Sequence, residues 1–268
     1  MNARNLALGL ALATTLSSAT ALASADAATA HHASRSDRAG AYQVTAKVNA
    51  TEPLLDTKVK IKATVSPAAP GAAVTLQVKY QDQKRWKTID HGRLTGASKV
   101  TFKDKIGSVR ERRYRVVKPA GAHRGAGQGT TPKVTVFGWR TLTSLDPVFA
   151  VGMFETAQTA IGGTSYPDSI TSLSTVTPPG PNHIDYNLNR DCKQLEATFG
   201  LADNSPTVST ATLALVADNV SKYSGTFGLA QSQAVTTDVT NVFRITVNST
   251  VTDGGIAAVG SPRVLCSF

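Results

Sequence analysis

Short runs in which apolar and polar residues alternate fill most of the chain from position 42 onward. The alternation is clearest at 58–65, where Val59, Ile61 and Val65 are separated by lysine or threonine. A period of two residues is that of a β-strand with one face buried and the other in solvent. Helical periodicity is absent from these runs, so the pattern predicts an all-β protein.

The first group of expected strands ends at position 137 and is punctuated by turn residues at short intervals. The expected strands lie at 42–48, 58–65, 74–78, 86–89, 100–102, 114–117 and 134–136. Seven strands at this spacing are typical of an immunoglobulin-like or fibronectin-like β-sandwich, which we expect at 42–137. The Gly-rich segment 119–132 is expected to be a mobile loop before the last strand.

The second group of expected strands fills 138–268 and predicts a second β-domain. Its segments lie at 138–145, 161–170, 184–188, 195–203, 211–216, 235–239, 242–247 and 257–267. Phe243, Ile245 and Val247 again alternate with polar residues, which favours strands over helices.

The N-terminus has the three parts of a secretory signal peptide. Arg4 precedes an apolar run at 6–22, and small-residue A-x-A sites follow at 23–25 and 28–30. The alternative is a membrane helix, but the run is short and rich in Ala and Thr, so we expect a signal peptide at 1–30. A flexible segment should follow at 31–41, and no transmembrane segment is expected later. The protein is therefore expected to be secreted, either free outside the cell or associated with the cell wall.

Charge divides the chain into two unlike parts. Residues 31–137 contain 21 Lys and Arg against 7 Asp and Glu, whereas residues 138–268 contain 6 against 10. A candidate face for an anionic polymer comprises Lys84, Arg85, Lys87, Arg110, Arg112, Arg113 and Arg115. Such attraction does not depend on sequence and is weakened by salt. The alternative is a solvated face, and export makes nucleic acid an unexpected partner.

Cys192 and Cys266 are the two cysteines of the chain. An even number of cysteines in an exported protein favours a disulfide, because the compartments outside the cytosol are oxidising. Free thiols are one alternative. Half of a metal site is another, for which His183 is the nearest histidine to Cys192, but a two-Cys site needs further His partners. We expect the disulfide and assign no residue to a metal.

Catalytic and metal-binding motifs are missing from the sequence. There is no G-x-S-x-G, H-E-x-x-H, P-loop or Rossmann glycine pattern. Glu196 falls in an alternating strand and is expected to be an exposed strand residue, not one of the two carboxylates of a glycosidase. We therefore expect a protein that is not an enzyme and has no cofactor. A calcium site remains an alternative at 203–205 and 218–219, and the composition of these segments is also that of Asx turns.

Two resemblances to known families follow from local sequence blocks. The blocks V-T-L-Q at 74–77, R-W-K-T-I at 85–89 and Y-R-V at 114–116 resemble the Ig-like domains of secreted actinobacterial proteins. This resemblance covers about a third of the chain and implies an Ig-like fold for 42–137. It implies nothing about a ligand.

The blocks I-G-G-T-S-Y at 161–166, Y-N-L at 186–188, L-E-A-T-F-G-L-A-D at 195–203 and P-R-V-L at 262–265 occur in the order found in another family. They resemble the carbohydrate-binding-module family with a galactose-binding-like jelly roll that is appended to glycoside hydrolases. The third block departs from the family pattern, since its aromatic residue is at Phe199 and not at the start. The resemblance implies a jelly-roll domain at 138–268, in which a bridge from Cys192 would pin the last strand.

The second resemblance also implies a function, which is to bind glycan without catalysis. Glycan binding needs aromatic platforms and polar side chains, and the candidates are Tyr166, His183, Asn187 and Trp139. Tyr186 is also considered as an aromatic candidate, and for both Trp139 and Tyr186 the alternative is a place in the core. The expected partner is a glycan or an anionic cell-wall polymer. The alternative is a structural or protein-interaction component of the cell envelope, with another envelope protein as its partner and no sugar site.

Overall fold

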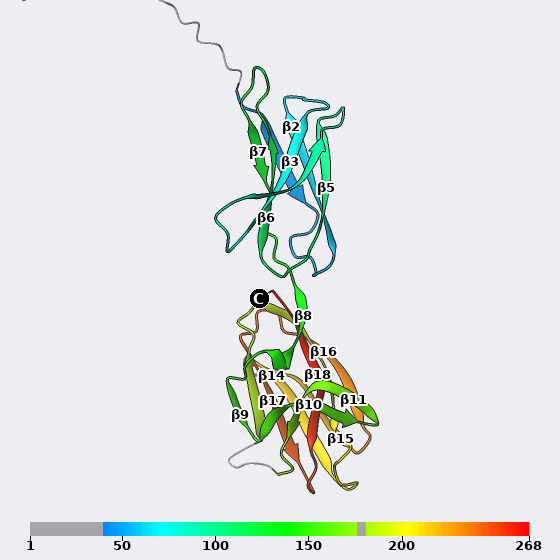
Figure 1. Cartoon of the computed structure of the whole chain (residues 1–268). Helices are drawn as coiled ribbons and strands as arrows, with labels where there is room; N and C mark the ends of the chain where they lie inside the picture. Colours follow the sequence, from blue (N-terminus) through cyan, green and yellow to red (C-terminus); the bar gives the residue numbers. More distant parts are fainter. Residues whose placement is uncertain (1–39, 176–180, 268) are drawn as a thin grey trace, which may run out of the picture. The chain divides into compact units, whose positions relative to one another are not determined.

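The computed structural model describes residues 40–175 and 181–267 (Figure 1). These residues form eighteen β-strands and a single 3-10 turn, η1 (Leu142–Ser144). They contain no helix that is long and apolar enough to cross a membrane. The all-β class predicted from the alternating pattern is therefore confirmed. The predicted signal peptide at 1–30 and almost all of the flexible segment at 31–41 lie outside the described residues.

Two antiparallel sheets form the first sandwich. Its strands are β1 (Gln43–Val48), β2 (Lys58–Ser66), β3 (Ala73–Tyr80), β4 (Lys87–Arg93), β5 (Lys99–Lys105), β6 (Arg112–Lys118) and β7 (Gly127–Thr130). One sheet has the order β1-β2-β5 and the other has the order β4-β3-β6-β7. Between them lies a closed apolar core that includes Ile61, Leu76 and Tyr114, each fully buried.

The strand β2 shows how the sequence specifies this sandwich. Its residues are alternately exposed and buried along all nine positions, with lysines in solvent and Val59, Ile61 and Val65 in the core. The strand cannot slip by one residue without burying its lysines, so the pairing register is strongly specified.

The last strand of this sandwich differs from the prediction. The final strand is β7, inside the segment expected to be a mobile loop, whereas Val134 forms only an isolated bridge to Arg112. Gly127 and Gly129 explain the difference, because a Cβ at either position would collide with the backbone of β1, at Tyr42 or Val44. These glycines allow close approach between two strands and do not mark a flexible loop.

Two further sheets form the second sandwich, which is a jelly roll. Its strands are β8 (Gly138–Thr141), β9 (Phe149–Val151), β10 (Met153–Ile161), β11 (Thr164–Ser172), β12 (Asn182–Asn187), β13 (Cys192–Leu201), β14 (Thr210–Ala217), β15 (Val220–Gly228), β16 (Ser232–Asp238), β17 (Arg244–Val251) and β18 (Ala257–Cys266). One sheet has the order β10-β11-β18-β13-β16, with β8 also paired to β18. The other has the order β15-β14-β17-β12-β9.

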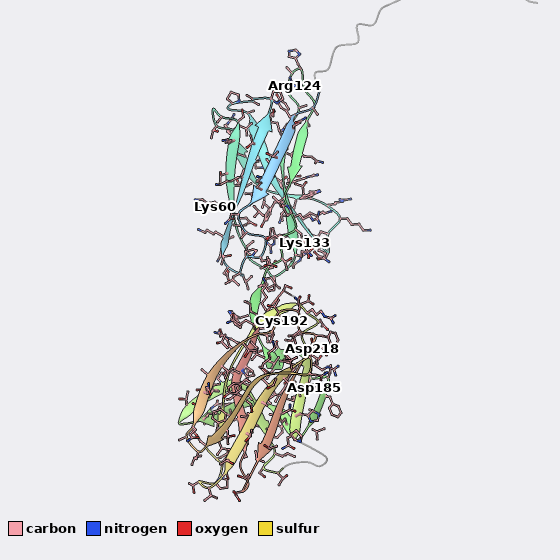
Figure 2. All side chains as sticks on the ribbon, turned by 180° about the vertical axis from the view of Figure 1, so that it is seen from behind. Lys60, Arg124, Lys133, Asp185, Cys192 and Asp218 are labelled. Carbon is pink, nitrogen blue, oxygen red and sulfur yellow. A yellow bond between two sulfur atoms is a disulfide. The ribbon has the colours of Figure 1, made fainter. Side chains whose placement is uncertain are left out.

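The core between these two sheets ends in the disulfide between Cys192 and Cys266, which confirms the predicted pairing. The bridge joins the first residue of β13 to the last residue of β18, and both cysteines are buried. The last strand, β18, is thus held covalently to β13, its neighbour in the sheet. Figure 2 labels Cys192 at this end of the second sandwich.

Three strands of the second sandwich have no counterpart among the expected segments. These are β9, β15 and most of β10. In β15 only Phe227 is buried, so the strand lacks the apolar alternation that the other strands show. The two domain boundaries that the sequence suggests, at 41–42 and 137–138, stay a prediction.

Candidate functional site

A β-bulge in β18 shapes one outer surface of the second sandwich. Glu196 of β13 pairs with Arg263 of β18 and Thr198 pairs with Gly260, so β18 has one extra residue between these two pairs. Ser261 lies within the bulge and has a positive φ of 43°. Its backbone N–H and its hydroxyl are held by β11, through Ser169 Oγ and the Pro167 carbonyl. Bulges of this kind re-aim side chains and are frequent beside functional sites.

The ring of Tyr166 lies over Gly260 at this bulge. A Cβ at Gly260 would be 2.5 Å from Cγ of Tyr166, so only glycine leaves room for the ring. Ile161 and Ala258 belong to a small buried apolar cluster against which the ring packs. Tyr166 is therefore fixed on the outer face of the sheet and is half-buried.

An ion pair lies next to this ring on the same face. Nε and Nη2 of Arg263 donate to Oε2 of Glu196 at 2.8 and 2.6 Å. The Arg263 guanidinium also lies over the Trp139 ring, 4.6 Å from its centroid. Arg263 is thus held between a carboxylate and an aromatic ring, which keeps its remaining N–H groups in a defined direction.

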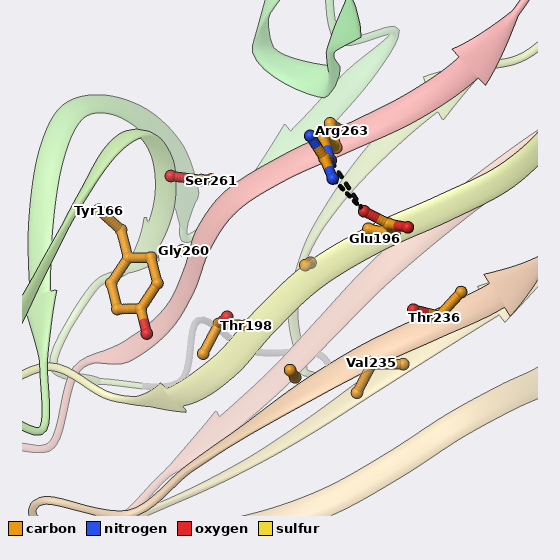
Figure 3. A pocket seen from close by; sticks show the side chains of 10 residues that line it. Tyr166, Glu196, Thr198, Val235, Thr236, Gly260, Ser261 and Arg263 are labelled. Carbon is orange, nitrogen blue, oxygen red and sulfur yellow. Dashed lines mark hydrogen bonds and ion pairs between the residues drawn. The ribbon is translucent and has the colours of Figure 1, made fainter. Parts of the chain in front are cut away.

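Tyr166, Glu196 and Arg263 line a shallow cleft of about 210 Å³, shown in Figure 3. We call it the Tyr166 cleft and define it by Tyr166, Glu196, Thr198, Thr236, Gly260 and Arg263. Among the described residues, the hydroxyls of Thr198 and Thr236 and Oε1 of Glu196 have no hydrogen-bond partner. The cleft therefore combines an aromatic ring with unused donors and acceptors, which suits a ligand that has both apolar and hydroxyl-bearing sides.

The four residues predicted to bind glycan do not form one site. Trp139 and Tyr166 lie on the sheet that carries β18, whereas His183 and Asn187 lie on β12 in the other sheet. His183 and Asn187 face outward, because Ile184 and Tyr186 beside them in β12 fill the core. Trp139 lies on the outer face of the other sheet, over Arg263, and Tyr166 lies on that face over Gly260. A single site with all four residues is therefore ruled out by the sandwich itself.

The environments of the four residues also differ. Trp139 is 37% exposed, so the alternative of a core position does not apply to it, whereas Tyr186 is fully buried. His183 stacks against Phe149, with ring centroids 5.3 Å apart. Asn187 accepts a hydrogen bond from Nε of Arg244 at 3.0 Å.

The two segments considered for calcium use their carboxylates to hold turns. Asp203 accepts from the N–H groups of Gly162 and Gly163 at 2.6 and 2.8 Å, and so caps the hairpin between β10 and β11. Asp218, labelled in Figure 2, accepts from the N–H groups of Phe243 and Arg244, both at 2.9 Å. These two hydrogen bonds lower the pKa of Asp218. Within 40–175 and 181–267 no three His, Cys, Asp or Glu side chains come together to hold a metal.

The residues of the predicted anionic-polymer face are partly engaged within the protein. Arg110 pairs with Asp82. Arg112 is buried, and its Nη2 donates to the Ser108 carbonyl at 2.5 Å. Arg115 donates to Gln77 and Gln128 and lies 4.5 Å from the centroid of the Trp86 ring. The other four members, Lys84, Arg85, Lys87 and Arg113, are exposed.

Several residues of the Tyr166 cleft were not found by sequence reasoning. Glu196 was expected to be an exposed strand residue; it lies in β13 as expected but is only partly exposed, and its position beside Arg263 depends on the bulge in β18. Gly260 carried no signal that could distinguish it from a turn glycine. The sequence pattern can place a residue on one face of a strand, but it cannot give the register between β13 and β18.

Residues 145–259 match the family model of the NPCBM/NEW2 domain. The resemblance of the C-terminal half to a carbohydrate-binding-module family is thereby confirmed. A search of curated proteins gave no match.

Two solved structures are similar to this chain at low sequence identity. One is carbohydrate-binding module CBM36 in complex with calcium and xylotriose, with 13% identity, a TM-score of 0.31, and coverage of 47% of this chain and 98% of that chain. The other is the PKD domain of human KIAA0319, with 20% identity, a TM-score of 0.24, and coverage of 42% of this chain and 90% of that chain.

Proposed function

We propose that this protein is an exported, non-catalytic binding protein whose second sandwich binds glycan in the Tyr166 cleft. The observation that carries the proposal is the fixed Tyr166 ring beside the Glu196–Arg263 pair. A sugar ring has an apolar face that stacks on an aromatic ring and a rim of hydroxyls that pairs with planar polar groups. The NPCBM/NEW2 match at 145–259 supports the same function.

The cleft has too few carboxylates for hydrolysis, which favours a binding role. Glycosidases of the usual kind place two carboxylates on either side of the scissile bond. The lining of the Tyr166 cleft includes one carboxylate, that of Glu196, and Arg263 neutralises it. The cleft is also shallow, so it would not exclude water from a bound ligand.

The test is retention of the whole protein on a panel of insoluble polysaccharides and purified cell walls. Tyr166→Ala should lower the affinity for the retained glycan about tenfold, which corresponds to the loss of one aromatic contact. Tyr166→Phe should retain most of the binding, because the ring remains.

Phe149→Ala is the matched control. Phe149 is 54% exposed and lies on the opposite sheet, so its removal should leave binding unchanged. Equal losses in Tyr166→Ala and Phe149→Ala, or a loss in Phe149→Ala alone, would exclude the Tyr166 cleft as the glycan site.

We also propose that the first sandwich attaches the protein to an anionic polymer of the cell wall. The excess of basic residues in 31–137 supports this attachment. The signal-like N-terminus and the disulfide support export, since disulfides persist in oxidising compartments.

A second candidate function is that of a structural or protein-interaction component of the envelope. Its support is a group of exposed apolar side chains on β9, on β10 and in the neighbouring segments, comprising Val148, Phe149, Phe154 and Leu173. Exposed apolar side chains at neighbouring strands are typical of protein contacts. A stoichiometric protein partner whose binding is lost in Phe154→Ala, but not in Tyr166→Ala, would favour this function.

A further inference from the structure

The outer face of the β1-β2-β5 sheet carries lysines on all three strands. Along these strands twelve side chains are exposed, and they comprise seven lysines, three threonines, one serine and one glutamine. We call this surface the lysine face. Its lysines are Lys47 of β1, Lys58, Lys60 and Lys62 of β2, and Lys99, Lys103 and Lys105 of β5.

The strand register places these lysines opposite one another. Lys58 is the partner of Lys105, and Lys60 is the partner of Lys103. Lys47 is likewise the partner of Lys62. Like charges directly opposite on one face of a sheet destabilise the fold, so this arrangement has a cost, which an acidic neighbour offsets only at Lys105, through Asp56, among the described residues.

Most of these lysines also have no ion-pair partner within the described part of the chain. Of the seven, only Lys105 has an ion pair with a described residue, Asp56, at 3.2 Å. Asp104, the one acidic residue within these strands, does not face the lysines, because it accepts a hydrogen bond from the Tyr114 hydroxyl at 2.7 Å. This contrasts with the arginines at 110, 112 and 115, whose guanidinium groups are held by Asp82, Ser108 and Gln77.

A groove of about 360 Å³ crosses the lysine face between its three strands. It is lined by the side chains of Thr45, Lys47, Lys62, Thr64, Lys99 and Thr101. Threonine hydroxyls can donate to anionic oxygens between the lysine ammonium groups. Lys60, the third residue of β2 and labelled in Figure 2, extends the positive surface beyond this groove.

Refining the proposed attachment to a wall polymer, we propose that the lysine face is the docking surface for an extended polymer with repeating phosphodiester groups. Every exposed residue on the face is polar, so the face has no apolar side chain to insert into a membrane. It contains no arginine, which is the residue suited to bidentate pairing with planar carboxylates, whereas lysine binds phosphate as a point charge. Lysines two residues apart on a strand are about 6.7 Å apart, so the face offers rows of charge to an extended chain.

The test compares two triple variants of the whole protein that lose the same charge. The first is Lys60→Gln, Lys62→Gln and Lys103→Gln on the lysine face. The control is Lys84→Gln, Arg85→Gln and Lys87→Gln, which removes three exposed members of the predicted anionic-polymer face. Binding to immobilised poly(glycerol phosphate) is measured across a salt series, with polygalacturonate and anionic phospholipid vesicles as separate arms.

We expect the lysine-face variant to lose about tenfold or more in affinity for poly(glycerol phosphate) and its salt slope to fall by about 2. The control should lose about threefold or less. Thermal unfolding should show the lysine-face variant to be folded and no less stable than the wild type, since it has lost like-charge pairs.

Equal losses in both variants would overturn the inference, because net charge and not this face would then determine binding. Stronger binding to polygalacturonate or to vesicles than to poly(glycerol phosphate) would overturn the assignment of a phosphodiester polymer. The lysine-face variant retains the Tyr166 cleft, so its binding to the retained glycan should be unchanged. Failure of the glycan function would instead appear as equal glycan binding by the wild type and Tyr166→Ala.

Discussion

The Tyr166 ring rests on Gly260, with no room for a Cβ between the two residues. The 2.5 Å separation between such a Cβ and Cγ of Tyr166 is well below ordinary contact distance. The crowded atom is at the root of the tyrosine side chain, so a small rotation of the ring cannot relieve the clash. The position of the ring in the cleft therefore depends on a residue that does not itself offer a functional group.

Gly260→Ala should weaken glycan binding about as much as Tyr166→Ala, about tenfold, because the added methyl group moves the ring off the cleft. The measurement is the affinity of each variant for the retained glycan. Gly228→Ala is the control, since a Cβ there would have Gln231 as its nearest neighbour at 3.6 Å. Undiminished binding by a folded Gly260→Ala protein would mean that the position of the Tyr166 ring is irrelevant.

Removal of the disulfide should destabilise the second sandwich. Cys192 and Cys266 are 74 residues apart, and a loop of this length contributes about 4 kcal/mol in the chain-entropy model. The double variant Cys192→Ser and Cys266→Ser should lose about 2–4 kcal/mol in the free energy of unfolding, measured with urea. Reductant should have a comparable effect on the wild type and none on the variant. A wild type that is equally stable with and without reductant would contradict this expectation.

The second sandwich should lose stability in alkali through Tyr186. Burial, and then the hydrogen bond to Glu155, raise the pKa of the Tyr186 phenol. The folded protein therefore keeps this proton at a pH where the unfolded chain releases it, so the free energy of unfolding falls as the pH rises above about 10. Urea unfolding at a series of pH values from neutral to alkaline measures how the free energy of unfolding changes with pH.

Tyr186→Phe is the matched variant for the alkaline slope. The substitution should lower the free energy of unfolding by about 1 kcal/mol at neutral pH, because a buried hydrogen bond is lost. The free energy of unfolding of the variant should then decrease less steeply with rising pH than that of the wild type. The pKa of Tyr114 in the first sandwich is also raised by burial, so some loss of stability with rising pH should remain in this variant. Parallel slopes in the wild type and Tyr186→Phe would contradict the role of Tyr186.

Calcium should not stabilise the fold. The carboxylates of Asp203 and Asp218 each accept two backbone hydrogen bonds, so a cation would have to displace these turn contacts. The melting temperature in millimolar calcium should equal that in chelator. A calcium-dependent rise that is lost in Asp203→Asn would show that the hairpin cap doubles as a metal site.

Much of the fold could be predicted because many strands alternate between buried and more exposed residues. In β2 every second side chain is buried and these side chains are apolar, so the apolar pattern alone identifies this strand. The failures have physical causes in particular residues. Gly127 and Gly129 have the composition of a loop although they permit strand contact, and β15 has too few buried side chains to produce a pattern.

The candidate sites were less predictable than the fold. Sequence reasoning named Tyr166 and Trp139, because glycan binding needs aromatic platforms, but it also named His183 and Asn187, which lie on another sheet. It also placed the anionic-polymer face on residues that include the buried Arg112. Which charged side chains are paired internally depends on strand register and on contacts such as Arg115 with Gln77, and these follow from the tertiary structure alone.

The most direct test of the glycan-binding account is a titration of the ¹⁵N-labelled protein with the retained glycan, followed by two-dimensional NMR. The account predicts that the largest shifts occur at the backbone N–H groups of Thr198, Gly260 and Ser261, around the Tyr166 cleft. Shifts centred on Val151 and His183 of the opposite sheet, or no saturable shifts with any glycan of the panel, would contradict it.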